Sequence, residues 1–379
     1  MGGGLLQLVA YGAQDVYLTG NPQITFFKVV YRRHTNFAME SIEQTFNGTA
    51  DFGRRVTCQI SRNGDLIHRM YLQTTFGAMT GLDSYTGLKM IKSVELEIGG
   101  QRIDKQYGDW MYIWNELSLP SGKTTGYDTM VGSSAFTTAG KVLYTPLEFW
   151  FCRNPGLALP LIALQYHEVK VNLEFRALAE LAYGSAYAPT GVSLGTTSLW
   201  VDYIFLDTDE RRRFAQLSHE YLIEQLQFTG EETASSKVKL NFNHPVKELV
   251  WVMQDASLVG SGTSNFWMDF TISTANPVTT AKLQLNGHDR FAERAGSYFS
   301  LVQPYQHHTN VPVNKGINVY SFALKPEEHQ PSGTLNMSRI DTAVLNLTYN
   351  ASADRIQVYA TNYNVLRVMS GMGGLAYSN

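Results

Sequence analysis

The order of strand signals in the first half of the chain recurs in the second half, and this recurrence constrains the fold more than any other feature. Short runs in which apolar and polar residues alternate predict half-buried β-strands. Three matched pairs are Val56-Thr-Cys-Gln-Ile with Val238-Lys-Leu-Asn-Phe, Val94-Glu-Leu-Glu-Ile-Gly-Gly with Ala281-Lys-Leu-Gln-Leu-Asn-Gly, and Val171-Asn-Leu-Glu-Phe with Leu345-Asn-Leu-Thr-Tyr. A shared order of this kind predicts the duplication of one all-β unit of about 150 to 180 residues, built as a sandwich or jelly roll.

An aromatic segment follows the second matched strand in each half, at residues 107–117 and 291–301. The first segment carries four bulky apolar side chains at helical spacing, and we expect a short helix that plugs a sheet. These side chains are Trp110, Ile113, Trp114 and Leu117. Elsewhere, Asn63-Gly64 predicts a β-hairpin between the runs on either side of it.

Residues 207–227 separate the two tracts and predict a connecting amphipathic helix. Asp207 is placed as its N-cap, and Phe214, Leu217 and Tyr221 recur on one helical face. The size of the chain agrees with a boundary here, because 379 residues exceed the ~250 to 300 at which a single core stops growing.

A basic run inside this segment consists of Arg211, Arg212 and Arg213. One interpretation is a phosphate or nucleic-acid contact. The other is a solvated helix face whose charge is balanced by the nearby acidic residues Asp209 and Glu210. We favour the second, and we expect these arginines to contact the other unit or a neighbouring subunit.

Composition restricts the classes of function. The chain is 44% hydrophobic and 17% charged, with 21 Tyr, 19 Phe and 32 Gly, which favours strands and turns. A formal net charge of -3 argues against direct nucleic-acid binding. No run reaches the ~18 apolar residues of a membrane span, so we expect no membrane insertion. The only two cysteines, Cys58 and Cys152, suit neither a disulfide framework nor a CxxC metal site and are expected in the core.

Catalytic and metal signatures are sparse. We find neither an H-E-x-x-H motif nor a P-loop, and His307-His308 would place neighbouring side chains on opposite faces of a strand. We therefore predict that the protein is not an enzyme and holds neither a metal nor a cofactor. Paired carboxylates that lie far apart along the chain, as in glycosidases, stay open at this stage.

Four N-x-[ST] sequons are candidate glycosylation sites. They lie at Asn47, Asn336, Asn346 and Asn350. The alternative is chance occurrence in a β-protein rich in Asn and Thr. Asn346 falls inside a predicted strand, so it ranks below Asn47 and Asn350.

Residues 1–20 read as an apolar arm that ends at the turn signal Gly20-Asn21-Pro22. The overlapping stretch 8–37 includes the residues Gln14-Asp-Val-Tyr-Leu-Thr-Gly-Asn-Pro22. This stretch closely resembles the N-terminal signature of major capsid proteins of nucleocytoplasmic large DNA viruses. Residues 205–215 and 362–379 resemble the same family. The algal-virus and giant-virus branches are the most similar.

The resemblance implies a double jelly roll, that is, two eight-stranded antiparallel β-sandwiches with a few short helices. The predicted parts are an arm at 1–20, a first jelly roll at 21–206, the connecting helix at 207–227 and a second jelly roll at 228–379. Three chains would form a trimeric, pseudo-hexagonal capsomer that tiles an icosahedral shell.

The expected partners are two further copies of the chain, neighbouring capsomers, minor capsid proteins and, in some relatives, glycans. The arm residues Asp15, Tyr17, Asn21 and Pro22 are assigned to assembly on the inner side of the shell. The protein is expected in the virion, after assembly in the host cytoplasm.

Two alternatives remain. Within the same class, the chain could be a minor capsid or penton component. From another class, it could be a carbohydrate-binding or carbohydrate-cleaving β-sandwich protein, a function that the Trp and Tyr content would serve.

Overall fold

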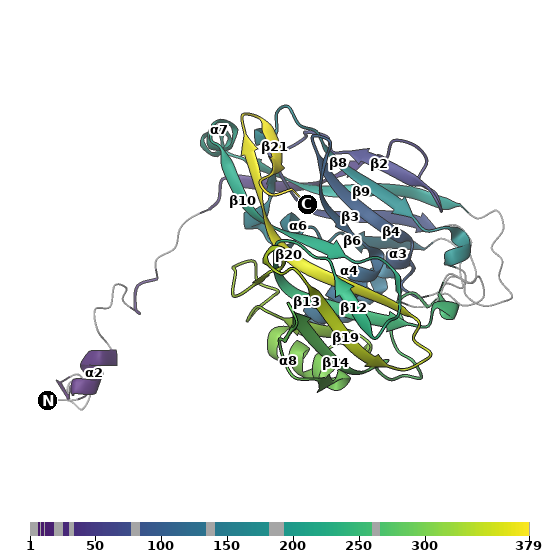
Figure 1. The fold of residues 1–379 in the computed structure, drawn as a ribbon. Helices are drawn as coiled ribbons and strands as arrows, with labels where there is room; N and C mark the ends of the chain where they lie inside the picture. Colours follow the sequence, from purple (N-terminus) through teal and green to yellow (C-terminus); the bar gives the residue numbers. More distant parts are fainter. Residues whose placement is uncertain are drawn as a thin grey trace. The chain divides into compact units, whose positions relative to one another are not determined.

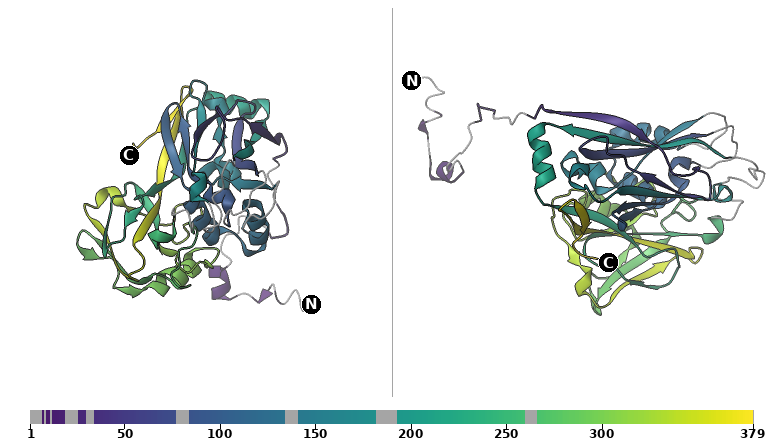
Figure 2. Two further views of the ribbon diagram at one scale, coloured as in Figure 1. Left: turned by 90° about the vertical axis from the view of Figure 1, so that its right-hand side faces the viewer. Right: turned by 90° about the horizontal axis from the view of Figure 1, so that it is seen from above.

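The computed structural model describes residues 7, 9–10, 12–18, 26–29, 34–76, 84–133, 141–181, 193–259 and 266–378. The chain divides into two units, residues 1–37 and 38–379. The first unit contains the short helix α2 (Ala13–Leu18). The second unit holds two β-sandwiches that lie side by side (Figures 1 and 2).

The first sandwich consists of a five-stranded sheet and a four-stranded sheet whose inner faces share one core. One sheet has the order β1 (Phe37–Gln44), β9 (Leu194–Leu206), β3 (Leu66–Phe76) and β6 (Val142–Pro146), and the short β7 (Leu159–Pro160) also pairs with β3. The other has the order β2 (Arg55–Gln59), β8 (Val169–Phe175), β4 (Ile91–Ile98) and β5 (Gln101–Gln106). Alternate residues of β8 point into the core, as period-2 patterning requires.

The second sandwich repeats this arrangement. One sheet has the order β10 (His219–Phe228), β20 (Arg355–Met369), β13 (Pro245–Gln254) and β17 (Asn318–Ser321), extended by β11 (Glu232–Thr233), β18 (Leu335–Asn336) and β21 (Met372–Leu375). The other has the order β12 (Lys237–Leu240), β19 (Ala343–Tyr349), β14 (Val278–Leu285) and β15 (His288–Asp289), and β16 (Arg294–Ala295) pairs with β14.

Both sandwiches therefore follow one topology. Each sandwich has eight strands in the two sheet orders given above, apart from the short strands that pair at their sides. When these eight are numbered along the chain, the first, eighth, third and sixth form one sheet and the second, seventh, fourth and fifth form the other. This is the order of a jelly roll. The predicted duplication and the double jelly roll are confirmed, and the three matched sequence pairs are β2 with β12, β4 with β14 and β8 with β19.

The turn that follows the second matched strand has the same backbone conformation in both rolls. Gly99 and Gly100 have φ of 58° and 85°, and Asn286 and Gly287 have φ of 49° and 80°. Two consecutive residues with positive φ form the type I′ hairpin turn, which Gly and Asn adopt with least strain. Accordingly, β4 pairs with β5 and β14 pairs with β15.

Short helices fill the connections. The α-helices in the described part of the second unit are α3 (Thr86–Lys89), α4 (Gly108–Ser118), α5 (Ser121–Val131), α6 (Trp150–Arg153), α7 (Thr208–Gln216) and α8 (Gln303–His307). A π-helical turn, η5 (Tyr298–Val302), leads into α8, and the 3-10 turns are η1 (Pro155–Leu157), η2 (Leu161–Ala163), η3 (Leu178–Glu180), η4 (Ala256–Leu258) and η6 (Met337–Arg339). Among the described residues, no helix is long and apolar enough to cross a membrane.

The predicted connecting helix at 207–227 is wrong over its second half. Asp207 does cap α7, since its side chain accepts a hydrogen bond of 2.7 Å from the Thr208 N–H, but the helix ends at Gln216. His219–Phe228 is β10, which pairs along its whole length with β20. Ten residues of ladder pairing to a strand more than 130 positions away outweigh a local helical periodicity that sequence alone can see.

The predicted hairpin at Asn63-Gly64 is also wrong, because β2 and β3 belong to different sheets. Neither residue has a positive φ. Gly64 is required for another reason: a Cβ there would lie 2.8 Å from the Cβ of Tyr203 on β9. The segment crosses from one sheet to the other, and the Tyr203 hydroxyl secures it by donating to the Ser61 carbonyl at 2.6 Å.

Candidate assembly surfaces

Helix α4 joins the two rolls. It belongs to the first roll but packs on the outer face of the sheet that contains β20 and β13 of the second roll. Trp110 contacts Tyr359 with ring centroids 5.3 Å apart, and Tyr107, just before the helix, meets Phe228 at 4.7 Å. Ile113 is fully buried, as predicted for the apolar face of this helix. Because the outer face of the second roll shares a core with the first, the two rolls form one packed body.

A buried ionic network reinforces this junction. The Arg153 guanidinium on α6 donates to Glu224 on β10 at 2.8 Å and lies 4.1 Å over the Trp114 ring. Lys247 and His329 approach the same carboxylate at 3.0 and 3.2 Å. Burial favours the neutral form of Glu224, but these three partners lower its pKa to about 2. The carboxylate is therefore ionised and links elements of both rolls.

A second buried pair lies at the start of α4. Arg176, at the end of β8, donates to both carboxylate oxygens of Asp109 at 3.1 and 3.0 Å, and each side chain is only 4% exposed. The guanidinium also donates to the Lys89 carbonyl at 3.1 Å and lies 3.7 Å over the ring of Trp267 in the second roll. This geometry satisfies the charge of Arg176 on several sides.

His308 is fully buried between two carboxylates. Its Nε2 lies 2.9 Å from Glu248 and its Nδ1 lies 3.0 Å from Glu327. Burial alone would lower the pKa of His308, but the two glutamates raise it to about 9. Both ring nitrogens are thus engaged by ion pairs, and the described residues contain no group of three His, Cys, Asp or Glu arranged to hold a metal. Sequence reasoning missed this site because both glutamates are remote along the chain.

The two cysteines and a serine in an esterase-like sequence pattern do not form a catalytic site of the expected kind. Cys58 and Cys152 are buried free thiols, as expected of core residues, and burial raises the pKa of Cys58 to about 11. Residues 191–195 match the esterase pattern G-x-S-x-G. Ser193 of this pattern directly precedes strand β9 and does not occupy the strand-to-helix turn that a catalytic serine of that class requires.

The three arginines of α7 are exposed. Arg211 pairs with Asp65, which precedes β3, at 3.0 Å, and Asp65 also accepts a hydrogen bond of 2.8 Å from the Leu206 N–H. Arg211 therefore fixes α7 against the first roll. A contact of Arg212 and Arg213 with another subunit stays a prediction.

The four sequon asparagines differ in their surroundings. Asn47 is exposed. Asn336 and Asn350 are also exposed, but each side chain accepts a hydrogen bond from the backbone N–H two residues on, at 3.1 and 3.0 Å. Asn346 is half-buried in β19 and donates to Gln284 at 3.0 Å. Asn47 is thus the best-presented acceptor of the four.

The assigned arm residues lie in the unit 1–37. Asp15 and Tyr17 belong to α2, and the Asp15 carboxylate accepts a hydrogen bond of 2.9 Å from the Gly12 N–H. Asn21 and Pro22 lie outside the described residues. Their role in assembly stays a prediction.

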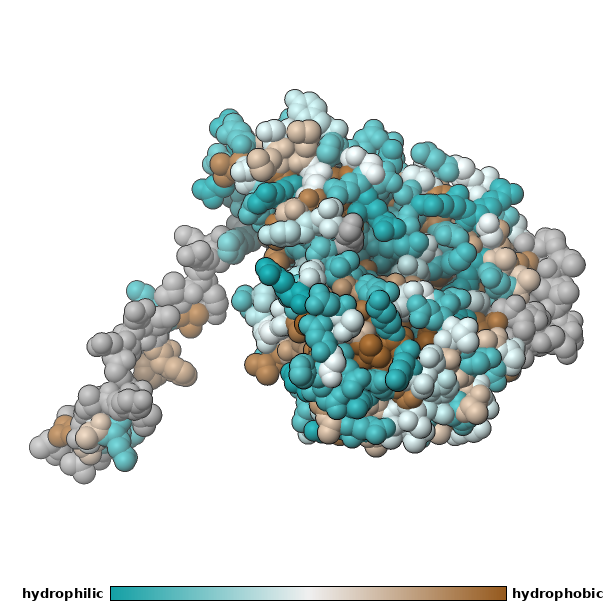
Figure 3. Space-filling view, viewed as in Figure 1, coloured by the Kyte–Doolittle hydropathy of each residue, from teal (hydrophilic) through white to brown (hydrophobic). Residues whose placement is uncertain are grey.

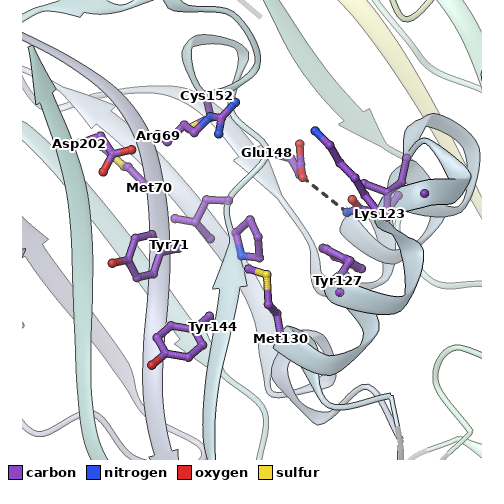
Figure 4. A pocket seen from close by; sticks show the side chains of 16 residues that line it. Arg69, Met70, Tyr71, Lys123, Tyr127, Met130, Tyr144, Glu148, Cys152 and Asp202 are labelled. Atoms are coloured by element: carbon purple, nitrogen blue, oxygen red, sulfur yellow. Dashed lines mark hydrogen bonds between the residues drawn. The ribbon is translucent and has the colours of Figure 1, made fainter. Parts of the chain in front are cut away.

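A groove of about 770 Å³ lies between α5 and the outer face of the first roll's β3–β6 region (Figure 4). Tyr71 and Tyr144 project from the strands, Met130 and Tyr127 come from α5, and most of the lining is apolar.

A second set of apolar side chains is exposed on the second roll. These are Leu301, Val302 and Tyr305, on η5 and α8. Figure 3 shows hydrophobic patches among hydrophilic side chains on the lower part of this unit, where the second roll lies in Figure 1.

Two jelly rolls of one topology, packed together in a single chain, define a double jelly-roll protein of the viral capsid class. Comparison with family models agrees. Residues 25–207 match the major capsid protein N-terminus, and residues 210–374 match the large eukaryotic DNA virus major capsid protein. The chain belongs to the major capsid protein family of large eukaryotic DNA viruses.

Individual relatives cover the whole chain. It is 62% identical to the major capsid protein of Pyramimonas orientalis virus and 48% identical to that of Paramecium bursaria Chlorella virus 1, with 100% of both chains covered in each case. It is also similar to the crystal structure of PBCV-1 VP54, with a TM-score of 0.84 and 43% identity over 94% of this chain and 100% of that one. The Faustovirus major capsid protein, 14% identical with a TM-score of 0.76 over 95% of this chain and 94% of that one, shares the fold.

The protein is thus a structural capsid protein of the virion. Its action is assembly with neighbouring capsid components. The carbohydrate-binding interpretation gives way to the family match.

Proposed function

We propose that three copies of this chain form a capsomer of pseudo-hexagonal outline that tiles an icosahedral shell. The observation that carries this proposal is the duplication: two jelly rolls of the same topology are packed into one body. Three such bodies around a threefold axis present six similar units, so one gene product can repeat similar contacts in six directions. Closed rings of identical chains are the usual form of protein oligomers.

Many weak contacts between capsomers would then make a stable shell, as in multivalent binding. Neighbouring capsomers and minor capsid proteins are the further partners of this proposal, with assembly in the host cytoplasm. The residues 1–20 and the exposed arginines Arg212 and Arg213 are its further candidate contacts.

The test is the mass of the purified protein in solution. Three times the 42.4 kDa chain gives about 127 kDa by native mass spectrometry. A monomer at micromolar concentration would overturn the trimer. Abundance separates a major capsid protein from a minor or penton component, because only a major protein dominates the mass of purified particles.

A further inference from the structure

The segment formed by η5 and α8 in the second roll occupies the position that α4 occupies in the first. Both lie between the fifth and sixth strands of their roll. Both begin at a glycine that has no room for a side chain. A Cβ on Gly108 would collide with the carbonyl oxygen of Ile91, and a Cβ on Gly296 would collide with that of Val278. Ile91 and Val278 are the first residues of the matched strands β4 and β14, so the two glycines are equivalent.

Counting onward from these glycines aligns the outward faces of the two segments. Ile113, Trp114 and Leu117 of α4 correspond to Leu301, Val302 and Tyr305. The three α4 residues share a helical face with Trp110, which contacts Tyr359 of the second roll, and they are 0%, 4% and 0% exposed. Their counterparts are 49%, 39% and 80% exposed. The inward-facing counterparts Met111 and Phe299 are both fully buried. The two segments are thus anchored alike on their inward sides, but the outward side is buried in α4 and exposed in the segment of η5 and α8. We call Leu301, Val302 and Tyr305 the ridge.

The surface that receives α4 also has an equivalent. Trp110 of α4 contacts Tyr359 on β20 of the second roll, and Tyr359 pairs with Val250 on the neighbouring strand β13. In the first roll the matching strands β3 and β9 pair Tyr71 with Trp200. These two rings stack with centroids 6.2 Å apart and planes 2° apart, and Tyr144 on β6 meets Tyr71 edge-on at 6.1 Å.

Among the residues that the structure describes, this face of the first roll is open where its counterpart is covered. Val250 and Tyr359 are fully buried, whereas Tyr71 and Trp200 are half-buried and Tyr144 and Met130 are each 38% exposed. The apolar groove described above lies over this face (Figure 4). Each chain therefore carries one exposed ridge and one open apolar groove, and its own α4 shows how the two fit.

We propose that the ridge of one copy seats in the groove of the next copy, lined by Tyr71, Tyr144 and Met130, and so repeats between chains the contact that α4 makes within the chain. The occupant of the groove is a second copy of this chain. The inference rests on the proposed trimer and assigns its interface. A contact between two different surfaces of identical chains is heterologous and generates a closed ring when the rotation permits, here after three copies.

Three charge substitutions test the assignment by native mass spectrometry over a dilution series. Tyr305→Glu alters the ridge and Tyr144→Glu alters the groove. Tyr166→Glu is the matched control, because Tyr166 on the connection from η2 to β8 is 76% exposed and lies on neither surface. The ridge and groove variants should raise the concentration at which the trimer dissociates at least tenfold, and the control should leave it unchanged. Circular dichroism and thermal unfolding confirm that the variants are folded, as expected for changes at exposed positions.

Mixing the two variants separates a heterologous contact from a symmetric one. The ridge variant keeps an intact groove and the groove variant keeps an intact ridge, so their mixture should give 1:1 dimers held by one intact contact, and neither variant alone should do so. A photo-reactive residue at position 305 of the otherwise unaltered chain should crosslink to the first roll of another copy, at the peptides containing Met130 or Tyr144.

The outcomes distinguish the two proposals. If the wild-type chain is a trimer and both variants form trimers as readily, the ridge and groove assignment is wrong and the trimer stands. Crosslinks from position 305 to any other surface overturn the assignment in the same way. If the wild-type chain is a monomer, the proposed trimer itself fails.

Discussion

Removing the charge of Asp109 should destabilise the protein far more than breaking an ion pair on the surface. Asp109→Asn keeps the shape of the side chain and one acceptor oxygen, but it leaves the Arg176 guanidinium, 4% exposed, without an anionic partner. Breaking a buried pair from one side costs about 3 to 5 kcal/mol, because an uncompensated charge stays buried. Arg176 retains the Lys89 carbonyl and the Trp267 ring, so we expect a loss near the lower end, about 3 kcal/mol.

The assay is unfolding in guanidinium chloride followed by tryptophan fluorescence, to which Trp267 beneath Arg176 contributes. Protein concentration is held constant, since association adds to apparent stability. The control is Lys92→Met, which breaks an exposed pair with Glu174 (57% and 34% exposed) and should cost about 1 kcal/mol or less. Replacing both partners, as Asp109→Leu with Arg176→Met, should cost less than Asp109→Asn alone. The reasoning is refuted if Asp109→Asn and Lys92→Met have equal effects.

Three further predictions concern the charge of His308, the packing of Gly296 and the N-terminal residues. The pKa of His308 is raised from 6.5 to about 9 in the folded protein, so the stability that this charge contributes is complete below about pH 6.5 and is lost as the pH rises through 9. His308→Gln lowers the unfolding free energy, and this loss should shrink by about 3 kcal/mol between pH 6 and pH 10. A loss that stays constant over this range would contradict the ion pairs. Gly296→Ala should lower the free energy of unfolding by about 1 to 3 kcal/mol or more, measured by thermal unfolding, because its Cβ would collide with the Val278 carbonyl oxygen. Gly122→Ala lies on α5 with open space around it and should be neutral or stabilising by about 1 kcal/mol. Deleting residues 1–20 should spare the trimer in native mass spectrometry but impair shells seen by electron microscopy, and normal shells from the truncated chain would disprove a role of the arm in assembly.

With the proposed interface, the duplication would let the protein use one kind of contact twice. Within the chain, α4 of the first roll covers the second roll. Between chains, the equivalent segment of the second roll would cover the first roll of a neighbour. Six similar junctions would then alternate around the capsomer between contacts within chains and contacts between chains.

The duplication and the class of fold were predictable from the amino-acid sequence. Alternation with period 2 and turn pairs such as Gly99-Gly100 and Asn286-Gly287 are local properties, so they identified matched strands and hairpins without any partner in view. The bulky face of α4 was predictable for the same reason. Residue-level resemblance then identified the family, because it covered both ends and the middle of the chain.

Features that depend on distant partners could be recognised only in the folded chain. His219–Phe228 has a local pattern that also fits a helix, and its pairing with β20 makes it a strand. His308 gains its charge from Glu248 and Glu327, which no spacing rule connects to it. The ridge is likewise a property of the folded chain, since Tyr305 and Leu117 occupy equivalent positions but are 80% and 0% exposed. Periodicity records which side of an element is apolar, but the surface that covers that side is a property of the packed chain.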